Sequence, residues 1–340
     1  MTLTGASAAI FGCAGLTLSA DETAFFRDAD PWGFILFARN VDNPAQVKAL
    51  VQDLRAAVGR DAPVLIDQEG GRVARLKAPH WRTWPWMSDL LARDIPEANI
   101  HVALRARFRL IAAELHDLGI DVNCMPMVDV IAPGADAIIT TRALGADPGL
   151  VARRGALIAE ALMEGGVLPV VKHVPGHGRA LVDSHAELPR VNARLTQLRE
   201  VDFTPFRALA HLPMMMTAHV IYAAIDADNC ATHSARCIDA IRGDIGFHGL
   251  LMTDDLGMGA LTGDFRHRAE TSFTAGCDIG LHCSGNMREM VAVMTGTPRL
   301  TGPALSRARA AEHARCAPAP CDVDELTRRH AYLIGDAPDV

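Results

Sequence analysis

Short runs of apolar residues recur along the chain, each bounded by turn-forming or polar residues. They stand at residues 8–13, 33–37, 63–67, 121–125, 168–172, 213–217, 249–253 and 278–283. Within each run the apolar residues are continuous rather than alternating, which is typical of strands buried on both faces of a parallel sheet. The pattern therefore predicts eight β-strands.

The segments between these runs carry the longer periodicity of helices. Helices are predicted at residues 45–58, 98–118, 147–164, 195–210, 234–245 and 269–275, and after the last strand at 303–315 and 323–333. The last two are joined by a linker rich in proline and alanine, which ends the first of them. Regular alternation of strand and helix predicts an α/β fold with either a closed barrel or a doubly wound sheet.

Polar residues at the ends of the predicted strands favour the barrel. Six of the eight runs end at, or just before, a side chain capable of chemistry: Asp67, Asn123, Lys172 with His173, His219, Asp254 and His282. A barrel collects the C-terminal ends of all its strands on one rim, where the active sites of such folds lie. We therefore predict a single-domain (β/α)8 TIM-type barrel, catalytic over residues 1–300, with a helical extension at 301–340 packed on it.

Composition limits which binding partners and which cellular compartment are expected for this protein. The 340 residues are 49% hydrophobic and carry a formal net charge of -7, with no Lys/Arg-rich run, so neither nucleic acid nor an anionic membrane is an expected partner. The N-terminus lacks the basic start of a signal peptide, and no apolar stretch approaches the roughly 18 residues of a membrane span. Eight scattered cysteines without a C-x-x-C pair indicate reduced thiols. We expect a cytoplasmic protein that is a monomer or a weak dimer.

The most polar segment, VVKHVPGHGRALVDSHAELPRV, follows the fifth predicted strand. Lys172 and His173 stand at the strand end, where they can donate hydrogen bonds to ligand hydroxyls. The three histidines 173, 177 and 185 could instead bind a metal, or only tie the loop to itself, but no H-E-x-x-H or C-x-x-C spacing accompanies them. We predict neither a metal nor a cofactor.

Within the same segment Asp183 precedes His185 by two residues. A carboxylate beside an imidazole fixes its tautomer and raises its pKa, which suits a group that first gives and later takes a proton. The pair is a candidate acid/base.

Two further motifs place carboxylates at strand ends. In LLMTDDL, successive side chains point to opposite sides, so we expect Asp254 to face the rim centre and Asp255 to cap a helix or bond backbone amides. The alternative is that both acids serve only as helix caps. In VLIDQEGGRVARL, Asp67 can accept hydrogen bonds from sugar hydroxyls, unless Asp67, Glu69 and Arg72 form only a loop-stabilising salt-bridge network.

Taken together, D-Q-E-G-G-R-V, K-H-x-P-G-H-G followed by D-S-H, and T-D-D-L resemble glycoside hydrolase family 3, specifically its single-domain bacterial β-N-acetylglucosaminidases. The resemblance covers roughly residues 12–286. Val174 stands where the motif usually carries Phe, and the segment TTRALG around Arg142 differs from relatives that more often show Arg-Ser.

The resemblance implies a role for each matching residue. Asp254 corresponds to the nucleophile, His185 to an unusual histidine acid/base and Asp183 to the carboxylate that orients it. The implied substrate-binding residues are Asp67, Arg75, Arg142, Lys172, His173 and His219.

The implied activity is retaining hydrolysis of terminal non-reducing β-linked N-acetylglucosamine through a covalent glycosyl-aspartate. The expected partner is a small carbohydrate, either an N-acetylglucosaminyl muropeptide from peptidoglycan recycling or a chito-oligosaccharide. The alternatives are a non-catalytic sugar-binding barrel, a β-glucosidase of the same family and a metal-dependent barrel hydrolase.

Overall fold

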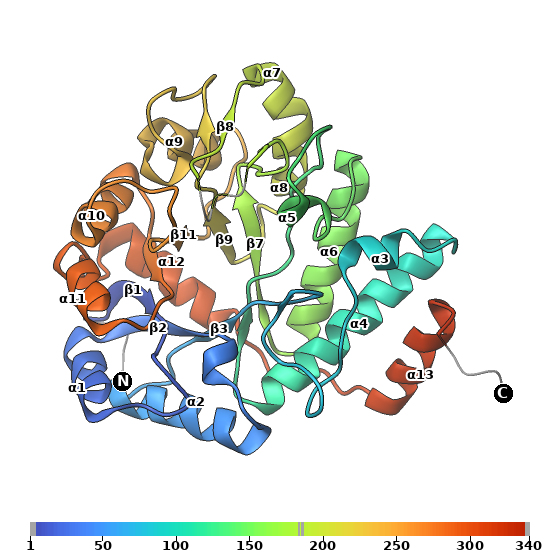
Figure 1. Cartoon of the computed structure of the whole chain (residues 1–340), viewed down its shortest axis with the longest axis horizontal. Helices are drawn as coiled ribbons and strands as arrows, with labels where there is room; N and C mark the ends of the chain where they lie inside the picture. The colour runs from blue at the N-terminus through green and yellow to red at the C-terminus, as the bar shows by residue number, and fades with distance from the viewer. Residues whose placement is uncertain (1–4, 183, 185–186, 337–340) are drawn as a thin grey trace.

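Parallel strands form the centre of the molecule. A computed structural model describes residues 5–182, 184 and 187–336, and within these ranges eight parallel strands close a barrel in the order β1-β12-β11-β9-β7-β6-β3-β2 (Figure 1). They are β1 (Ser7–Phe11), β2 (Pro31–Leu36), β3 (Val64–Ile66), β6 (Val122–Asn123), β7 (Leu168–Val174), β9 (Met214–Thr217), β11 (Leu250–Asp255) and β12 (Ile279–His282). The predicted (β/α)8 barrel is confirmed, and each predicted strand overlaps one of these.

Helices surround the barrel (Figure 1). The longer ones are α1 (Ala20–Ala29), α2 (Pro44–Val58), α4 (Glu97–Asp117), α6 (Pro148–Glu164), α9 (Ala235–Gly243), α10 (Phe265–Ala275), α11 (Met287–Thr295), α12 (Gly302–His313) and α13 (Val323–Leu333). The shorter ones are α3 (Met87–Leu91), α5 (Ala137–Thr140), α7 (Leu195–Gln197) and α8 (Phe203–Ala208), with a π-helical turn at Leu198–Asp202 between the last two and 3-10 turns at Ala38–Asn40 and Ala231–His233.

Local capping explains where the helix predictions failed. Helix α1 was not predicted, yet Ser19 and Glu22 form a reciprocal capping box at its start, a signature readable from the sequence. Helix α10 begins at Phe265 rather than 269 because the Asp264 side chain accepts a hydrogen bond from the backbone N–H of His267. Helix α11, capped by Asn286, was also missed.

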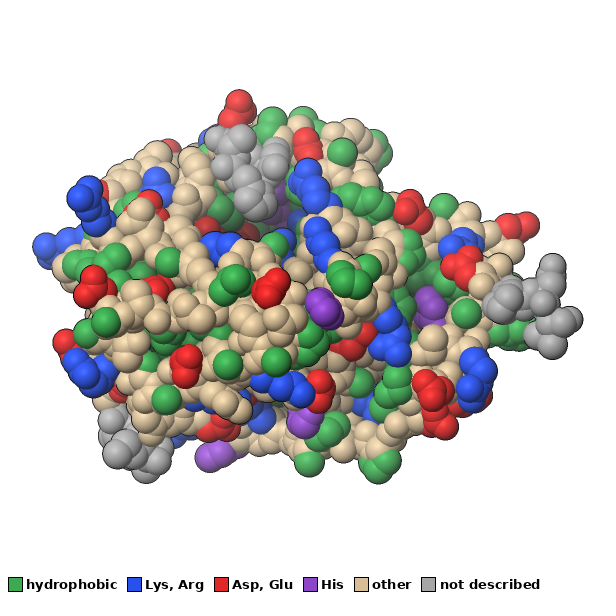
Figure 2. Space-filling model, turned by 60° about the horizontal axis from the view of Figure 1, so that its bottom comes forward, with side chains coloured by type: hydrophobic (Ala, Val, Ile, Leu, Met, Phe, Trp, Pro, Cys, Tyr) green, Lys and Arg blue, Asp and Glu red, His purple; other side chains and the backbone are tan. Residues whose placement is uncertain are grey.

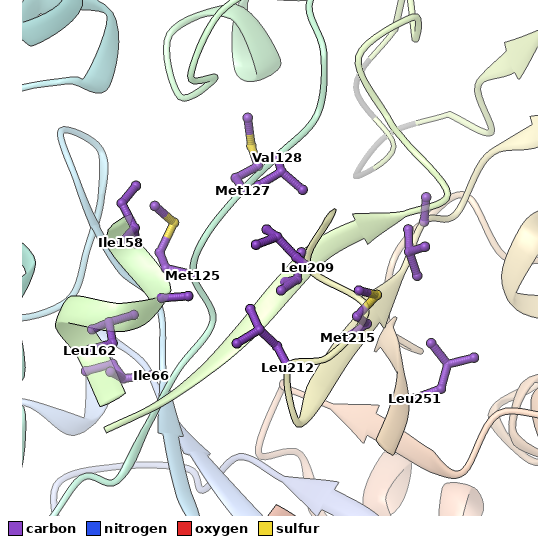
Figure 3. Packing of buried hydrophobic residues seen from close by; sticks show 14 of the residues in the cluster. Ile66, Met125, Met127, Val128, Ile158, Leu162, Leu209, Leu212, Met215 and Leu251 are labelled. Carbon is purple, nitrogen blue, oxygen red and sulfur yellow. The ribbon is translucent and has the colours of Figure 1, made fainter. Parts of the chain in front are cut away.

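Alternate residues of each strand supply two separate apolar cores. On β11, Leu250 and Met252 point into the barrel with the other inward-facing residues, whereas Leu251 joins the larger core between strands and helices. In that outer core, Met125 packs with Ile158 and Leu162 of α6 (Figure 3). Burial on both sides accounts for the continuous apolar runs in the sequence.

The two C-terminal helices pack on different parts of the barrel. Buried Ala308 and Ala311 of α12 belong to the same apolar cluster as the barrel interior, and Arg307 of this helix pairs with Asp278 before β12 at 2.8 Å. Helix α13 lies against α4 (Figure 1). Among the helices of the described ranges, none is both long and apolar enough to cross a membrane.

Candidate active site

A cavity of about 300 Å³ opens at the C-terminal ends of the barrel strands. The space-filling view shows this face hollowed, with acidic and basic side chains at the walls of the hollow (Figure 2). The cavity is lined by Ile35, Phe37, Asp67, Arg72, Val73, Arg75, Ile138, Arg142, Lys172, His173, Met216, Asp254, Asp255, Met258, Leu281 and Cys283. Its size lies at the small end of the range for small-molecule sites.

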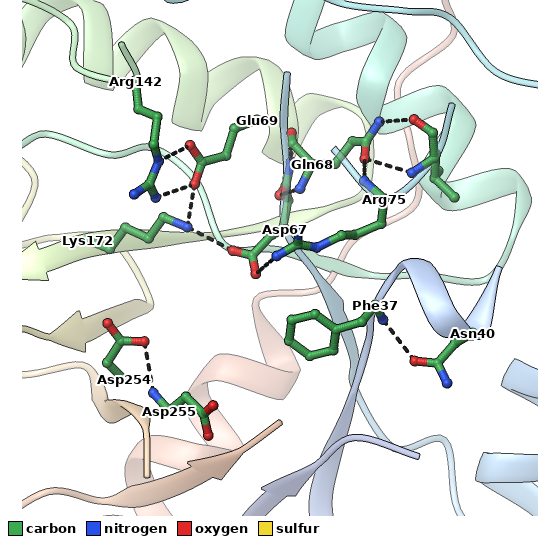
Figure 4. Close-up of polar contacts among 12 residues, drawn as sticks. Phe37, Asn40, Asp67, Gln68, Glu69, Arg75, Arg142, Lys172, Asp254 and Asp255 are labelled. Atoms are coloured by element: carbon green, nitrogen blue, oxygen red, sulfur yellow. Dashed lines mark hydrogen bonds and ion pairs between the residues drawn. The ribbon is translucent and has the colours of Figure 1, made fainter. Parts of the chain in front are cut away.

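One wall of the cavity is a connected network of ion pairs (Figure 4). Lys172 Nζ lies 2.8 Å from Asp67 Oδ1 and 2.7 Å from Glu69 Oε1. Arg142 donates to both carboxylate oxygens of Glu69, at 2.8 and 2.7 Å. Arg75 completes the network with a 3.1 Å hydrogen bond to Asp67 Oδ2. Asp67 and Glu69 therefore do belong to a salt-bridge network, as the alternative to sugar binding supposed, but its cations are Lys172, Arg142 and Arg75. Arg72, named in that alternative, is exposed and lines the cavity outside these pairs.

The cations hold both carboxylates of this wall in the ionised form. Burial raises the pKa of the Asp67 carboxyl, but Lys172 and Arg75 outweigh burial and hold that pKa well below its usual range. For Glu69, burial is likewise outweighed by Arg142 and Lys172, and the pKa falls to about 2. The wall thus presents fixed hydrogen-bond donors and acceptors to a ligand, which suits recognition of a polyhydroxylated molecule.

A short hairpin places Glu69 and Arg75. Strand β4 (Gln68–Gly70) pairs antiparallel with β5 (Val73–Ala74) directly after β3. Asn123 at the end of β6 bonds both the N–H and the C=O of Gln68, each at 3.1 Å. The Gln68 side chain in turn accepts from the N–H of Arg75 at 2.8 Å. Asn123, one of the predicted rim residues, therefore positions the hairpin from behind.

Asp254 and Asp255 end strand β11 and point in different directions. The Asp254 carboxylate is directed toward the wall of Lys172 and Asp67, and Asp255 turns away from it (Figure 4). Asp254 Oδ1 accepts the N–H of Asp255 at 2.8 Å. Asp255 Oδ1 accepts the N–H groups of Gly257 and Cys283 at 2.9 and 3.0 Å. As expected, Asp254 faces the cavity, and Asp255 bonds backbone amides.

Asp129, which no sequence motif pointed to, organises the end of β7 and the segment after it. Its carboxylate accepts from the His173 Nδ1 at 2.8 Å, and from the backbone N–H groups of His173 and His177 at 3.2 and 2.6 Å. Because Nδ1–H of His173 is committed to Asp129, Nε2 is the nitrogen this ring can offer at the cavity. Burial lowers the pKa of His177 to about 4, and its Nε2 bonds Ser184 Oγ at 3.0 Å.

The glycines of this segment allow it to lie close to its neighbours. A Cβ on Gly178 would fall 1.9 Å from the carbonyl oxygen of Val130, and the Gly178 carbonyl accepts from Ala132 N–H at 3.0 Å. The Tyr222 hydroxyl donates to the Gly176 carbonyl at 2.8 Å. Residues 176–178 are therefore fastened to the body of the barrel.

His219 lies behind the cavity wall, buried, and does not line the cavity. Its Nε2 is 3.0 Å from the Asp255 carbonyl and its Nδ1 is 2.7 Å from Thr232 Oγ1. Burial lowers its pKa, so the ring is neutral at pH 7. A carbonyl can only accept, so Nε2 carries the proton. Substrate contact by His219 stays a prediction, and this geometry favours support of the Asp254–Asp255 backbone instead.

The structure brings together most of the predicted site residues. Asp67, Arg75, Arg142, Lys172, His173 and Asp254 all line the cavity. Asp183 and His185 lie outside the described residues. Within the described ranges, no three His, Cys, Asp or Glu side chains are grouped so that they could hold a metal ion. His282 is buried and bonds Ser284 Oγ at 2.9 Å, away from the cavity lining.

Comparison with known proteins places this arrangement among carbohydrate-cleaving enzymes. Residues 16–303 match the glycosyl hydrolase family 3 N-terminal domain. The chain is 34% identical to a β-hexosaminidase of Bordetella avium, covering 94% of this chain and 91% of the relative. It is 35% identical to a β-hexosaminidase of Pseudomonas aeruginosa over 79% and 80% of the two chains. The crystal structure of NagZ from Neisseria gonorrhoeae in complex with N-trifluoroacetyl-D-glucosamine is similar, with a TM-score of 0.85, 29% identity and coverage of 98% and 99%.

Proposed function

Because the chain belongs to glycosyl hydrolase family 3, we propose that it is a retaining β-N-acetylglucosaminidase in which Asp254 is the nucleophile. The observation that carries the proposal is the direction of Asp254. Its carboxylate, at the end of β11, faces a wall of ion-paired donors and acceptors across a monosaccharide-scale cavity (Figure 4). A carboxylate so placed can reach the anomeric carbon of a sugar held by that wall.

The proposed chemistry has two steps. Asp254 attacks the anomeric carbon while His185, oriented by Asp183, protonates the departing glycosidic oxygen, giving a glycosyl-aspartate. His185 then removes a proton from water, whose oxygen attacks the same carbon and releases Asp254. The roles of His185 and Asp183 rest on the motif resemblance, since both residues lie outside the described part.

The wall residues account for binding. In the proposal Asp67, Arg75, Arg142, Lys172 and His173 hydrogen-bond the sugar hydroxyls and the acetamido group. N-acetylglucosamine as the glycone is supported by the β-hexosaminidase relatives and by the glucosamine derivative bound in the similar Neisseria structure. We propose a muropeptide of peptidoglycan recycling as the natural substrate, with a chito-oligosaccharide as the other candidate, and a cytoplasmic location.

Release of 4-nitrophenol from its β-N-acetylglucosaminide and β-glucoside, measured with and without a metal chelator, tests the proposal. Wild type should cleave the first and not the second, and Asp254→Asn should lose about 10³-fold or more in kcat, because covalent catalysis needs its nucleophile. Asp53→Asn, an exposed carboxylate on α2, is the matched control and should stay fully active. Sugar binding without turnover would establish a non-catalytic barrel. Preference for the glucoside would indicate a β-glucosidase. Loss of turnover when chelator is added would indicate a metal-dependent hydrolase.

A further inference from the structure

Arg107 of helix α4 is fully buried behind the active-site wall. Its NH2 group donates to the backbone carbonyls of Glu69 and Pro85, at 2.7 and 2.9 Å. No carboxylate among the described residues forms an ion pair with it, and its Nε and NH1 atoms are buried without a hydrogen-bond partner there. The charge is thus committed to two backbone carbonyls, one of which belongs to an active-site residue.

The surroundings of Arg107 are shaped to admit its guanidinium. A Cβ on Gly70 would fall 1.9 Å from Arg107 NH2, so the absence of a side chain at Gly70 makes the room. The indole of Trp84 covers the guanidinium with its ring centroid 5.5 Å away. The ring of His330, on α13, packs edge-on against Trp84, with the two ring centroids 5.2 Å apart.

A cation in this position is costly if its role is only to fill space. Burying a charge without a counter-ion is unfavourable, and apolar residues of similar size commonly replace buried ions without loss of stability. Burial lowers the pKa of Arg107 to about 10, so the group is still charged at neutral pH. Glu69 is the acidic group that attracts it.

We propose that Arg107 is a positioning residue for substrate binding, acting through Glu69. By holding the Glu69 carbonyl, Arg107 fixes the backbone from which the Glu69 carboxylate reaches Arg142 and Lys172. Those two cations line the sugar cavity, so a displaced Glu69 misplaces both. The inference rests on the proposed function, because the affected step is binding of the sugar.

The experiment compares three purified variants for kcat, KM and melting temperature on 4-nitrophenyl β-N-acetylglucosaminide. Arg107→Met keeps the apolar stem and removes the donors, and Arg107→Lys keeps a cationic donor. Leu115→Ala, a buried position about two turns further along α4, is the control for lost stability alone.

Arg107→Met should raise KM by about tenfold and leave kcat within about twofold of wild type. The reason is that binding of the ground state and of the transition state is weakened equally. Arg107→Lys should restore most of the affinity and leave KM about threefold above wild type. Leu115→Ala should leave KM unchanged.

Equal KM values for Arg107→Met and Leu115→Ala at comparable melting temperatures would overturn the inference and leave Arg107 a structural residue. If Arg107→Met does not fold, Arg107→Gln decides. Its shorter, neutral amide cannot hold both carbonyls, so KM should again rise by about tenfold, and a wild-type KM in that variant would overturn the inference. A wild type that cleaves no β-N-acetylglucosaminide would remove the proposed function, and this inference with it.

Discussion

Lys172 Nζ and Asp67 Oδ1 form an ion pair of 2.8 Å. The pair joins strand β7, which holds the lysine, to the residue directly after β3. The two residues are 105 positions apart in the chain and meet because parallel barrel strands end at one face. The lysine is 3% exposed and the aspartate 15%. The pair therefore lies in a partly dehydrated site, where loss of one member leaves the other charge uncompensated.

Lys172→Met should lower both activity and stability. Asp67 and Glu69 would lose a shared cation, which for buried pairs costs about 3–5 kcal/mol, and kcat/KM should fall by at least about 100-fold. The control is Lys48→Met, because Lys48 pairs with Asp117 at 3.0 Å on the surface, where a pair is worth about 1 kcal/mol or less. Urea unfolding of both variants makes the comparison, and similar losses in the two would contradict the assigned role of Lys172.

Glu69 should make stability depend on acid pH. Burial raises its pKa, but Arg142 and Lys172 outweigh burial and lower it from 4.5 to about 2. A lowered pKa stabilises the folded state above the unfolded value, by about 3 kcal/mol here, and this contribution is lost as pH falls from about 4.5 toward 2.

Melting temperatures of wild type and Glu69→Gln measured from pH 7 down to pH 3 check this. The difference should be large at pH 7 and shrink below pH 4.5. Glu325→Gln, at an exposed pair with Arg328, should show little difference at any pH. A wild-type advantage over Glu69→Gln that stays constant down to pH 3 would speak against the ion-pair account.

His219→Ala should lower kcat more than it raises KM. The ring supports the Asp255 carbonyl beside Asp254 and does not line the cavity. Its loss should therefore disturb the proposed nucleophile rather than the ion-paired wall of the cavity. We expect kcat to fall by about 10- to 100-fold with KM within about threefold. Arg142→Ala, which removes a cavity-lining donor, should show the reverse pattern. A raised KM at unchanged kcat in His219→Ala would instead support the prediction that His219 contacts the substrate.

Asp129→Asn should weaken binding by releasing His173. The asparagine can still accept one backbone N–H, but it loses the charge-assisted bond to His173 Nδ1, a class of bond worth about 1.5–3 kcal/mol. The expected result is a fall in kcat/KM of about tenfold or more. Asp136→Asn, at the N-cap of α5, provides a matched exchange elsewhere in the loops. Unchanged kinetics in Asp129→Asn would show that His173 needs no such support.

The strand pattern was sufficient to predict the barrel and much of its rim. Continuous apolar runs followed by Asp67, Lys172 and Asp254 predicted side chains that do meet at one cavity. The same rule also selected Asn123, which is turned toward the Gln68 backbone. Position at a strand end gives the face of the barrel but not the direction of the side chain.

Loop contacts could not be predicted in this way. Asp129 reaches His173 across 44 residues, and Arg142 reaches Glu69 across 73. Hydrophobic periodicity does not tell which loop residues meet. The sequence therefore offered only the nearby Arg72 as a partner for Glu69, in the alternative network, and gave no sign of Arg142 as its partner or of Asp129. The division at residue 300 and the acid/base roles of Asp183 and His185 stay predictions.

Trapping of the glycosyl-enzyme tests the central claim most directly. Wild type and Asp254→Asn are mixed with a fluorinated N-acetylglucosaminide whose deglycosylation is slow, quenched in acid and examined by intact-protein and peptide mass spectrometry. The account predicts that one sugar is added to wild type, on the peptide containing Asp254, and none to Asp254→Asn. A sugar attached to another residue, or turnover of wild type with no covalent species and inverted product, would contradict it.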